Sequence, residues 1–279
     1  MQHATSRQNP RLKSAARLIA SSRDRRKSGL CVLEGEHLIA VHLDRVGAPE
    51  ALLVVEEALA DPRIAALAAR VPAQDVVAVP AALFGEVSTL PADVGALAIV
   101  RTPAPALPPP ARFHLLVDDL QDPGNVGTIL RTAAAAGVQQ VLLSRHSAFA
   151  WSPKALRAGQ GAHFLTTIVE DVDLAQWAAA FRVAGGHVAV TVAHGGRDLY
   201  AAPLPWPLAV VIGNEGAGVS AALAAHADVA VTIPLPGGME SLNAAAAAAV
   251  VLFEAVRTGR AAGRAQSPAG AAGSVVGGR

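Results

Sequence analysis

The sequence has a single cysteine, few charged residues and no long apolar run, and each shortage excludes a class of protein. Cys31 alone cannot form an internal disulfide framework or a cysteine-based zinc cluster, and it fits a reducing compartment. The longest apolar run, Ala244 to Phe253, is half of the roughly 20 residues that a membrane span needs. With 52% hydrophobic and 16% charged residues, the chain is too apolar to be disordered. We expect a globular, cytoplasmic protein without a membrane partner.

Histidine is present but lacks the spacing of a metal site. No two of the nine histidines form an H-x-H or H-x-x-x-H pair, so scattered surface or core imidazoles are expected. No metal is therefore predicted.

Proline divides the chain. Its 279 residues exceed the usual single domain, and residues 103–110 hold five prolines, which favour a semi-rigid spacer over a helix or central strand. We predict one domain over 1–102, a linker over 103–110 and a second domain over 111–258. Residues 259–279, mostly Gly, Ala, Arg and Ser, are predicted to be a disordered tail.

Apolar runs alternate with helical patterns in both halves, which predicts an α/β fold. The first half is predicted to be a small α/β domain with strands at 30–33, 51–55, 76–79 and 96–100 and helices at 12–20, 36–46, 62–69 and 81–87. The second half is predicted to be a doubly wound parallel sheet with strands at 113–117, 138–143, 165–169, 187–192, 209–212 and 229–233 and helices at 126–136, 174–184, 220–225 and 242–257.

The first thirty residues are strongly basic. They hold eight lysines and arginines against Asp24 alone, a net charge of +7 on a chain whose total is +1. Such a block suggests a polyanionic partner, most commonly nucleic acid. An arginine- and serine-rich start is also typical of an organellar targeting segment. The loop 144–153 offers one further candidate RNA contact, Trp151, which could equally be a hydrophobic plug.

Three loops that follow strands of the second domain carry unusual polar residues. Ligands on such sheets bind beyond the carboxyl ends of the strands. The loop after 113–117 carries Asn125, which could cap the helix that follows, and that helix carries Arg131 on an otherwise apolar surface. The loop 213–218 sets Glu215 among three glycines, which let backbone approach a ligand closely. The third, 233–243, turns through Pro and Gly and is expected to enter its helix at Ser241, with Asn243 one turn inside.

These loops resemble the three signature motifs of the SpoU-type RNA ribose 2′-O-methyltransferases of the SPOUT class. The resemblance covers 118–137, 212–218 and 233–257, in the family's order and spacing. The first half is similar, more loosely, to the substrate-recognition domain of ribosomal-RNA members, through Asn9, the basic helix and Leu33-Glu34-Gly35.

The resemblance implies a trefoil knot between His187 and Arg257, a pocket for S-adenosylmethionine within it, a homodimer, and ribosomal RNA as substrate. Its cofactor contacts fall on Thr191, Gly213, Ile233 and Leu242, and its catalytic positions fall on Asn125, Arg131, Glu215, Ser241 and Asn243. Because a guanidinium is a poor base, we expect Arg131 to stabilise the developing alkoxide and to hold the nucleotide in line.

Other functions remain open at this stage. A transfer-RNA methyltransferase has the same motifs, and a catalytically inactive RNA-binding homologue would keep the fold. A nicotinamide-dependent oxidoreductase requires G-x-G-x-x-G after the first strand, which the G-x-x-G at 124–127 does not provide.

Overall fold

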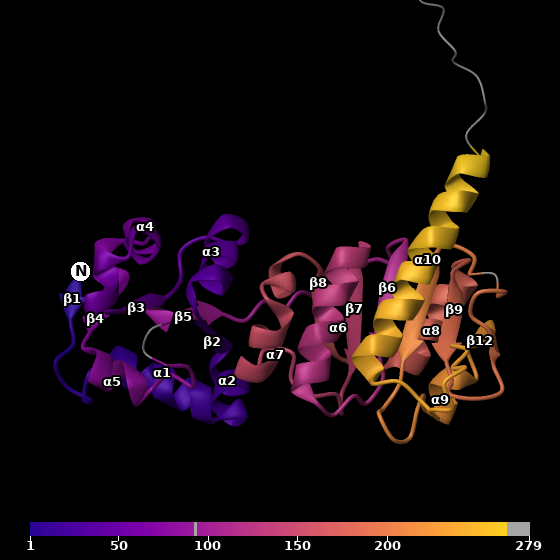
Figure 1. Ribbon diagram of the computed structural model, residues 1–279, viewed down its shortest axis with the longest axis horizontal. Helices are drawn as coiled ribbons and strands as arrows, with labels where there is room; N and C mark the ends of the chain where they lie inside the picture. The colour runs from indigo at the N-terminus through magenta and orange to yellow at the C-terminus, as the bar shows by residue number, and fades with distance from the viewer. Residues whose placement is uncertain (92–93, 203, 267–279) are drawn as a thin grey trace, which may run out of the picture.

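Two β-sheets, one in each half of the chain, organise the structure (Figure 1). The computed structural model describes residues 1–91, 94–202 and 204–266. Each sheet is covered by helices on both faces, so its central strands are buried. This burial explains why the strands read as continuous apolar runs in the sequence.

The amino-terminal sheet has the strand order β1-β4-β3-β5-β2. Side chains alternate across it: Leu52 and Val54 join the core on one face, and Leu53 and Val55 join the core on the other. Helices α3 and α4 cover the first face, and α1, α2 and α5 lie on the other side (Figure 1). The bounds are β1 Gln2–His3, α1 Pro10–Ala20, α2 Ser22–Ser28, β2 Leu30–Glu34, α3 Glu36–Arg45, β3 Ala51–Val55, α4 Pro62–Ala69, β4 Val76–Val79, α5 Ala81–Gly85 and β5 Ala96–Arg101.

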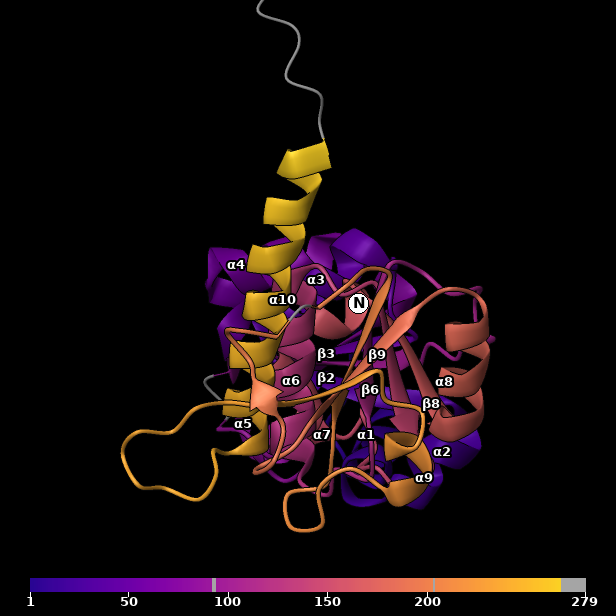
Figure 2. The ribbon, with the colours of Figure 1, turned by 90° about the vertical axis from the view of Figure 1, so that its right-hand side faces the viewer.

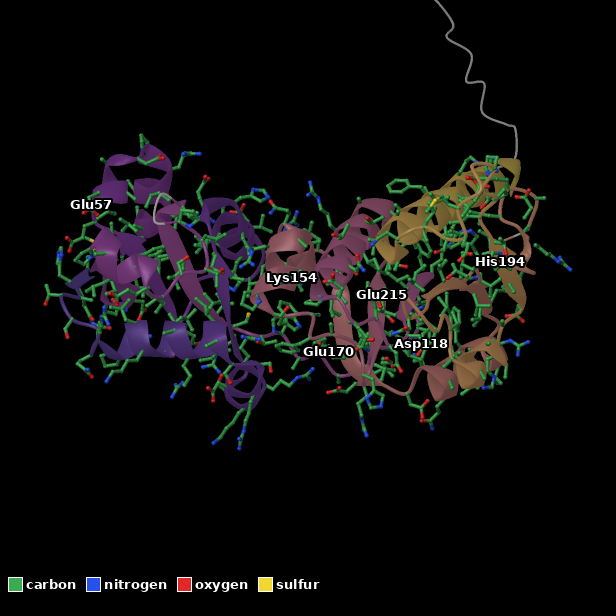
Figure 3. All side chains as sticks on the ribbon, turned by 60° about the horizontal axis from the view of Figure 1, so that its bottom comes forward. Glu57, Asp118, Lys154, Glu170, His194 and Glu215 are labelled. Atoms are coloured by element: carbon green, nitrogen blue, oxygen red, sulfur yellow. The ribbon has the colours of Figure 1, made fainter. Side chains whose placement is uncertain are left out.

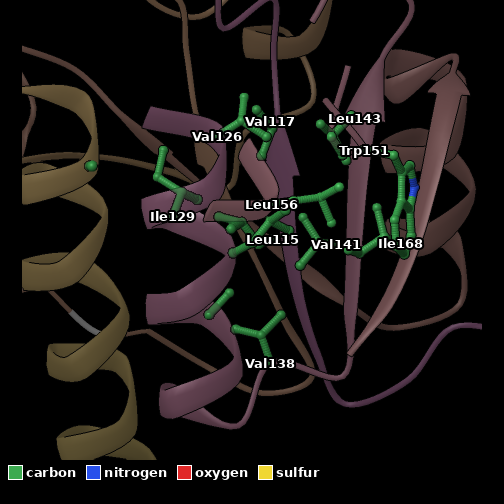
Figure 4. Packing of buried hydrophobic residues seen from close by; sticks show 14 of the residues in the cluster. Leu115, Val117, Val126, Ile129, Val138, Val141, Leu143, Trp151, Leu156 and Ile168 are labelled. Carbon is green, nitrogen blue, oxygen red and sulfur yellow. The ribbon is translucent and has the colours of Figure 1, made fainter. Parts of the chain in front are cut away.

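The carboxyl-terminal sheet has seven strands in the order β10-β12-β9-β11-β6-β7-β8, and every neighbouring pair is parallel. Helices α6 and α10 cover one face and α8 the other (Figure 2). Ile129 of α6 packs toward Leu115 and Val141 of the sheet (Figure 4). The bounds are β6 Phe113–Val117, α6 Pro123–Ala136, β7 Gln140–Ser144, α7 Pro153–Gly159, β8 Thr167–Val172, α8 Leu174–Val183, β9 His187–Thr191, β10 Arg197–Asp198, β11 Leu208–Ile212, α9 Ala221–Ala224, β12 Val229–Thr232 and α10 Ala244–Gln266.

Helix ends account for most differences from the sequence prediction. Asp122, not Asn125, caps α6 by accepting from Gly124 N, so this helix begins at Pro123. The prediction that α10 begins at Ser241 is wrong, because Asn243 is the cap and accepts from Ala245 N at 2.9 Å. Helix α10 also continues to Gln266, so residues 259–266 are helical, and the rest of the predicted tail, 267–279, lies outside the described residues. None of the described helices has the length and apolar character to cross a membrane.

The two halves contact one another directly, in addition to their covalent link through 103–110. Glu34 at the end of β2 has a side chain that is only 1% exposed and accepts from Arg157 of α7 at 3.0 Å. Ser88 and Thr89 donate to the same carboxylate at 2.8 Å. The predicted spacer therefore does not hold the domains apart. Trp151 is 1% exposed in the core beside this contact, so it is a plug and not an RNA-stacking residue.

A buried carboxyl group near the domain boundary makes stability depend on pH. Burial raises the pKa of Glu170 to about 7, against the opposing effects of a hydrogen bond from Ala150 N and the nearby Arg26, and Asp171 raises it further. The folded protein thus binds a proton that the unfolded chain releases above about pH 4.5. The resulting stabilisation, up to about 3 kcal/mol, is complete below pH 4.5 and is lost as the pH rises through 7.

We therefore expect Glu170→Gln to gain stability relative to the wild type between pH 5 and pH 8, because the amide stays neutral. Urea unfolding of both proteins at the two pH values measures this difference, and the other titrating groups cancel. Parallel pH profiles for the two proteins would contradict the assignment.

Candidate active site

Four loops meet at the carboxyl edge of the second sheet. They follow β6, β9 and β11, or lead from β12 into α10. In Figure 3 the bottom of Figure 1 is turned toward the viewer, and Asp118, Glu215 and His194 of these loops are labelled. Because all the strands of this sheet are parallel, their carboxyl ends bring together loops that are far apart in the sequence.

A cavity of about 500 Å³ opens among three of these loops. All four residues predicted to hold the cofactor line it, namely Thr191, Gly213, Ile233 and Leu242. Three of the five predicted catalytic residues also line it, namely Glu215, Ser241 and Asn243. The sequence prediction missed further lining residues, which are Val192, Ala193, His194, Leu235, Glu240 and Ala247. In the sequence, His194 is close to Thr191 and Glu240 precedes Ser241, but no periodic pattern singled out His194 or Glu240.

The glycine-rich loop after β11 folds tightly back on itself. Asn214 and Gly218 exchange backbone hydrogen bonds of 2.9 and 3.0 Å. A Cβ on Gly213 would lie 2.3 Å from the carbonyl carbon of Gly218, so only glycine fits there. The Asn214 side chain ties the loop to the first motif by donating to Asp119 O at 2.7 Å. The loop is therefore a fixed wall of the cavity.

Glu215, Asn125 and Asn243 form one hydrogen-bonded cluster. Asn125 Nδ2 donates to Glu215 Oε1 at 3.1 Å, and Asn243 Nδ2 donates to Asn125 Oδ1 at 3.1 Å. These residues are 90 and 118 positions apart in the chain. The structure thus joins the three sequence motifs through their polar side chains.

The Glu215 carboxylate is held in its charged form. Partial burial raises its pKa, but hydrogen bonds from the backbone of Gln121, its own backbone, the Asn125 amide and the backbone of Asp122 together lower it below the usual value. Gln121 N and Asp122 N each donate at 3.1 Å. Glu215 is consequently an anion at neutral pH that organises the amides around it.

The structure does not bring Arg131 and Ser241 into this cluster. Arg131 is exposed on the outward side of α6, does not line the cavity and has no ion pair or hydrogen bond with any residue that the structure describes. Ser241 lines the cavity but makes no side-chain hydrogen bond within the described ranges. Its predicted role as a helix cap belongs to Asn243.

The candidate ligands for a metal ion are the His, Cys, Asp and Glu side chains of the described part of the chain. No group of three or more His, Cys, Asp or Glu side chains there is arranged to hold a metal ion.

Comparisons with known proteins match both halves. The SpoU rRNA Methylase family matches residues 112–253, and the MRM3-like substrate binding domain matches residues 9–98. The chain is 32% identical to the 23S rRNA (guanosine(2553)-2′-O)-methyltransferase of Bacillus subtilis over 91% of its own length and 98% of that protein. It is 31% identical to the mitochondrial rRNA methyltransferase 3 of Mus musculus over 88% of its length and 72% of that protein.

A solved structure is similar throughout. The SpoU methyltransferase AviRb of Streptomyces viridochromogenes, crystallised in complex with AdoMet, superposes with a TM-score of 0.80 at 28% identity. The match covers 91% of this chain and 99% of that one.

Proposed function

This chain belongs to the SpoU rRNA methylase family, and we propose that it methylates a ribose 2′-hydroxyl of ribosomal RNA with S-adenosylmethionine. The observation that carries the proposal is the cluster of Asn125, Glu215 and Asn243 at the rim of the cavity. Three sequence motifs far apart in the chain converge there. The similarity of the whole chain to a 23S rRNA methyltransferase supports ribosomal RNA over transfer RNA as the target.

The cavity suits S-adenosylmethionine in size and chemistry. Its volume of about 500 Å³ lies within the range of small-molecule sites. Gly213 exposes backbone for close approach, and Ile233, Leu235 and Leu242 supply an apolar wall. Glu215 and Glu240 place carboxylates beside the space that a cationic ligand would fill. When bound, the cofactor supplies an electrophilic methyl group on a sulfonium.

The chain's own residues bind and orient the ribose. Glu215 remains ionised and fixes Asn125, which in turn fixes Asn243, so two amides are held at the mouth of the cavity. Ser241 adds a hydroxyl at the same wall. The cationic Arg131 stabilises the negative charge that develops on the 2′-oxygen, and it positions the neighbouring phosphate.

The protein acts as a homodimer in this proposal, because Arg131 makes no hydrogen bond to the Asn125, Glu215 and Asn243 cluster of its own chain. Two large apolar side chains of the site region are exposed, Leu242 by 39% and Met239 by 72%. Phe253 of α10 is exposed by 49%. An interface over α6 and α10 would cover these side chains and bring Arg131 to the partner's site.

We expect Phe253→Glu to give a monomer that loses methyl transfer, because it places a charge in this interface. Light scattering after gel filtration measures the oligomeric state. Val183→Glu is the matched control, since Val183 is 90% exposed on α8 and should leave a dimer. A Phe253→Glu protein that stays dimeric, or a fully active monomer, would contradict the interface.

We also propose the trefoil knot between His187 and Arg257 and a cytoplasmic location. The strand order supports the knot, since β12 lies beside β9 although β11 comes between them in the chain. The buried free thiol of Cys31 fits a reducing compartment. A crystal structure would test the knot, and cell fractionation would test the cytoplasmic location.

The function is tested with labelled methyl transfer from S-adenosylmethionine to RNA of a strain that lacks the protein, separated into large ribosomal, small ribosomal and transfer RNA. Label in one ribosomal fraction, at a site resistant to alkali, is expected. Label in transfer RNA would indicate a transfer-RNA methyltransferase instead. No label despite cofactor binding would indicate an inactive RNA-binding homologue.

A further inference from the structure

Nine arginines of the part of the chain that the structure describes form an ion pair with an acidic neighbour. Arg63, Arg70 and Arg182, for example, have carboxylate partners at 2.6 to 2.7 Å. Nine exposed cations have no ion pair or side-chain hydrogen bond among the described residues: Lys13, Arg17, Arg23, Lys27, Arg45, Arg112, Arg131, Arg145 and Arg197. An unpaired cation can bind a phosphate without giving up a carboxylate, so its position indicates where a polyanion would bind.

Four of these cations form two pairs on consecutive helices. Lys13 and Arg17 are four residues apart on α1, and Arg23 and Lys27 are four residues apart on α2, so each pair lies on one side of its helix. Helix α1 turns its apolar side, with Leu12, Ala15 and Leu18, to the sheet, which leaves its basic side exposed.

Arg25 and Arg26 hold α2 in place. The Arg25 side chain is buried and donates to the carbonyl oxygens of Leu18 and Ile19 at the end of α1. Arg26 reaches the other domain, with its guanidinium carbon 4.4 Å from the centre of the Phe149 ring and its Nη1 3.7 Å from Asp171. Helix α2 therefore lies beside the loop between β7 and α7.

That loop presents Arg145 and continues to the active site. Gln121 connects this loop to the active site. Its side chain donates to His146 O at 2.9 Å, and its backbone N donates to Glu215 Oε2 at 3.1 Å. Ser147 anchors the same loop to Val117 O.

Arg145 lines a hollow of about 390 Å³ whose acidic side chains are engaged elsewhere. Asp171 faces Arg26 at 3.7 Å, Asp173 caps α8 by accepting from Gln176 N at 3.0 Å, and Asp118 accepts from Ser220 N at 2.8 Å. Arg145 is exposed and forms an ion pair with none of these three carboxylates.

We propose that Lys13, Arg17, Arg23, Lys27 and Arg145 form a phosphate track that carries the RNA backbone from the amino-terminal domain to the Glu215 cluster. The inference rests on the proposed function and adds the surface by which RNA is held. Helices α1 and α2 lie on the same side of the molecule as the carboxyl edge of the second sheet, and Glu170 lies between α2 and Asp118 on that face (Figures 1 and 3). Phosphate contacts supply most of the affinity for RNA and fix the register of the bound strand.

The test compares two triple variants of the full chain. Arg23→Ala/Lys27→Ala/Arg145→Ala removes three track cations. Arg45→Ala/Arg63→Ala/Arg70→Ala removes the same charge from α3, α4 and their ends, on the opposite face of the amino-terminal domain. Affinity for protein-free 23S rRNA of Bacillus subtilis is measured over a range of salt concentrations, and cofactor affinity and thermal unfolding verify the folded state of each variant.

We expect the track variant to bind this RNA roughly tenfold to a hundredfold more weakly and to reduce the salt slope by about 2 to 3, since each phosphate contact contributes about 0.7 to 0.9. The control variant should keep the wild-type slope. Equal slopes in the track variant and the wild type, or an equal fall in both variants, would overturn the track. Failure of the proposed function is separate: it would appear as wild-type protein that binds this RNA but transfers no methyl group to any RNA fraction.

Discussion

Arg131→Ala is expected to lower methyl transfer by about 10² to 10³-fold while leaving the affinity for S-adenosylmethionine near that of the wild type. Removing one group that stabilises developing negative charge in an active site typically lowers the rate by about 10² to 10³-fold. Cofactor affinity should persist because Arg131 does not line the cavity, and its exposure means that the substitution removes no buried contact. Single-turnover transfer and calorimetric titration with the cofactor measure the two effects separately.

Arg145→Ala is the comparison variant, since it removes another exposed arginine that lies in the proposed phosphate track and outside the cluster. We expect it to affect the RNA concentration that gives half-maximal rate more than the maximal rate. Arg131→Lys should remain strongly impaired, because an ammonium cannot hold a phosphate and an alkoxide with the same fork of donors. A large loss of cofactor affinity in Arg131→Ala would instead make Arg131 a structural residue.

The architecture could be predicted from sequence because each sheet is buried on both faces. Strands β3 and β4 were predicted to the residue, since a run such as Ala51–Val55 has no polar position that could shift its ends. The short elements β1, α2 and β10 were missed for the opposite reason. Helix α2 has the sequence SRDRRKS, which has no apolar periodicity and is held in place by the side chain of Arg25.

The lining of the cavity was also predictable, but the geometry of its polar residues was not. The motif residues identified the loops, and parallel strands bring loops together at one edge. The bond between Asn125 and Asn243 depends on side-chain positions set by helix caps, and the sequence placed the cap of α10 at Ser241 instead of Asn243. The domain contact between Glu34 and Arg157 joins residues 123 positions apart and leaves no local pattern in the sequence.

Gly213→Ala is expected to weaken binding of S-adenosylmethionine by about 10- to 100-fold. The added Cβ would lie 2.3 to 2.5 Å from the backbone of Gly218 and Val219, and neither neighbour is the movable end of a side chain. Forcing such an atom into a packed site costs about 1 to 3 kcal/mol, and each 1.4 kcal/mol in binding corresponds to a factor of ten. The loop 213–218 must open to make room for the alanine Cβ. Because this loop is one wall of the cavity, the cavity changes shape.

Gly237→Ala tests whether this effect is specific. Gly237 belongs to another loop of the same region, and a Cβ there would meet no atom within 4 Å, so the cofactor affinity should stay at the wild-type value. The Gly213→Ala protein should still bind RNA with the wild-type salt dependence, because the phosphate track does not include the loop 213–218. Wild-type cofactor affinity in a folded Gly213→Ala protein would contradict the assignment of this cavity as the cofactor pocket. Joint loss of cofactor and RNA binding would instead mean that the substitution unfolds the carboxyl-terminal domain.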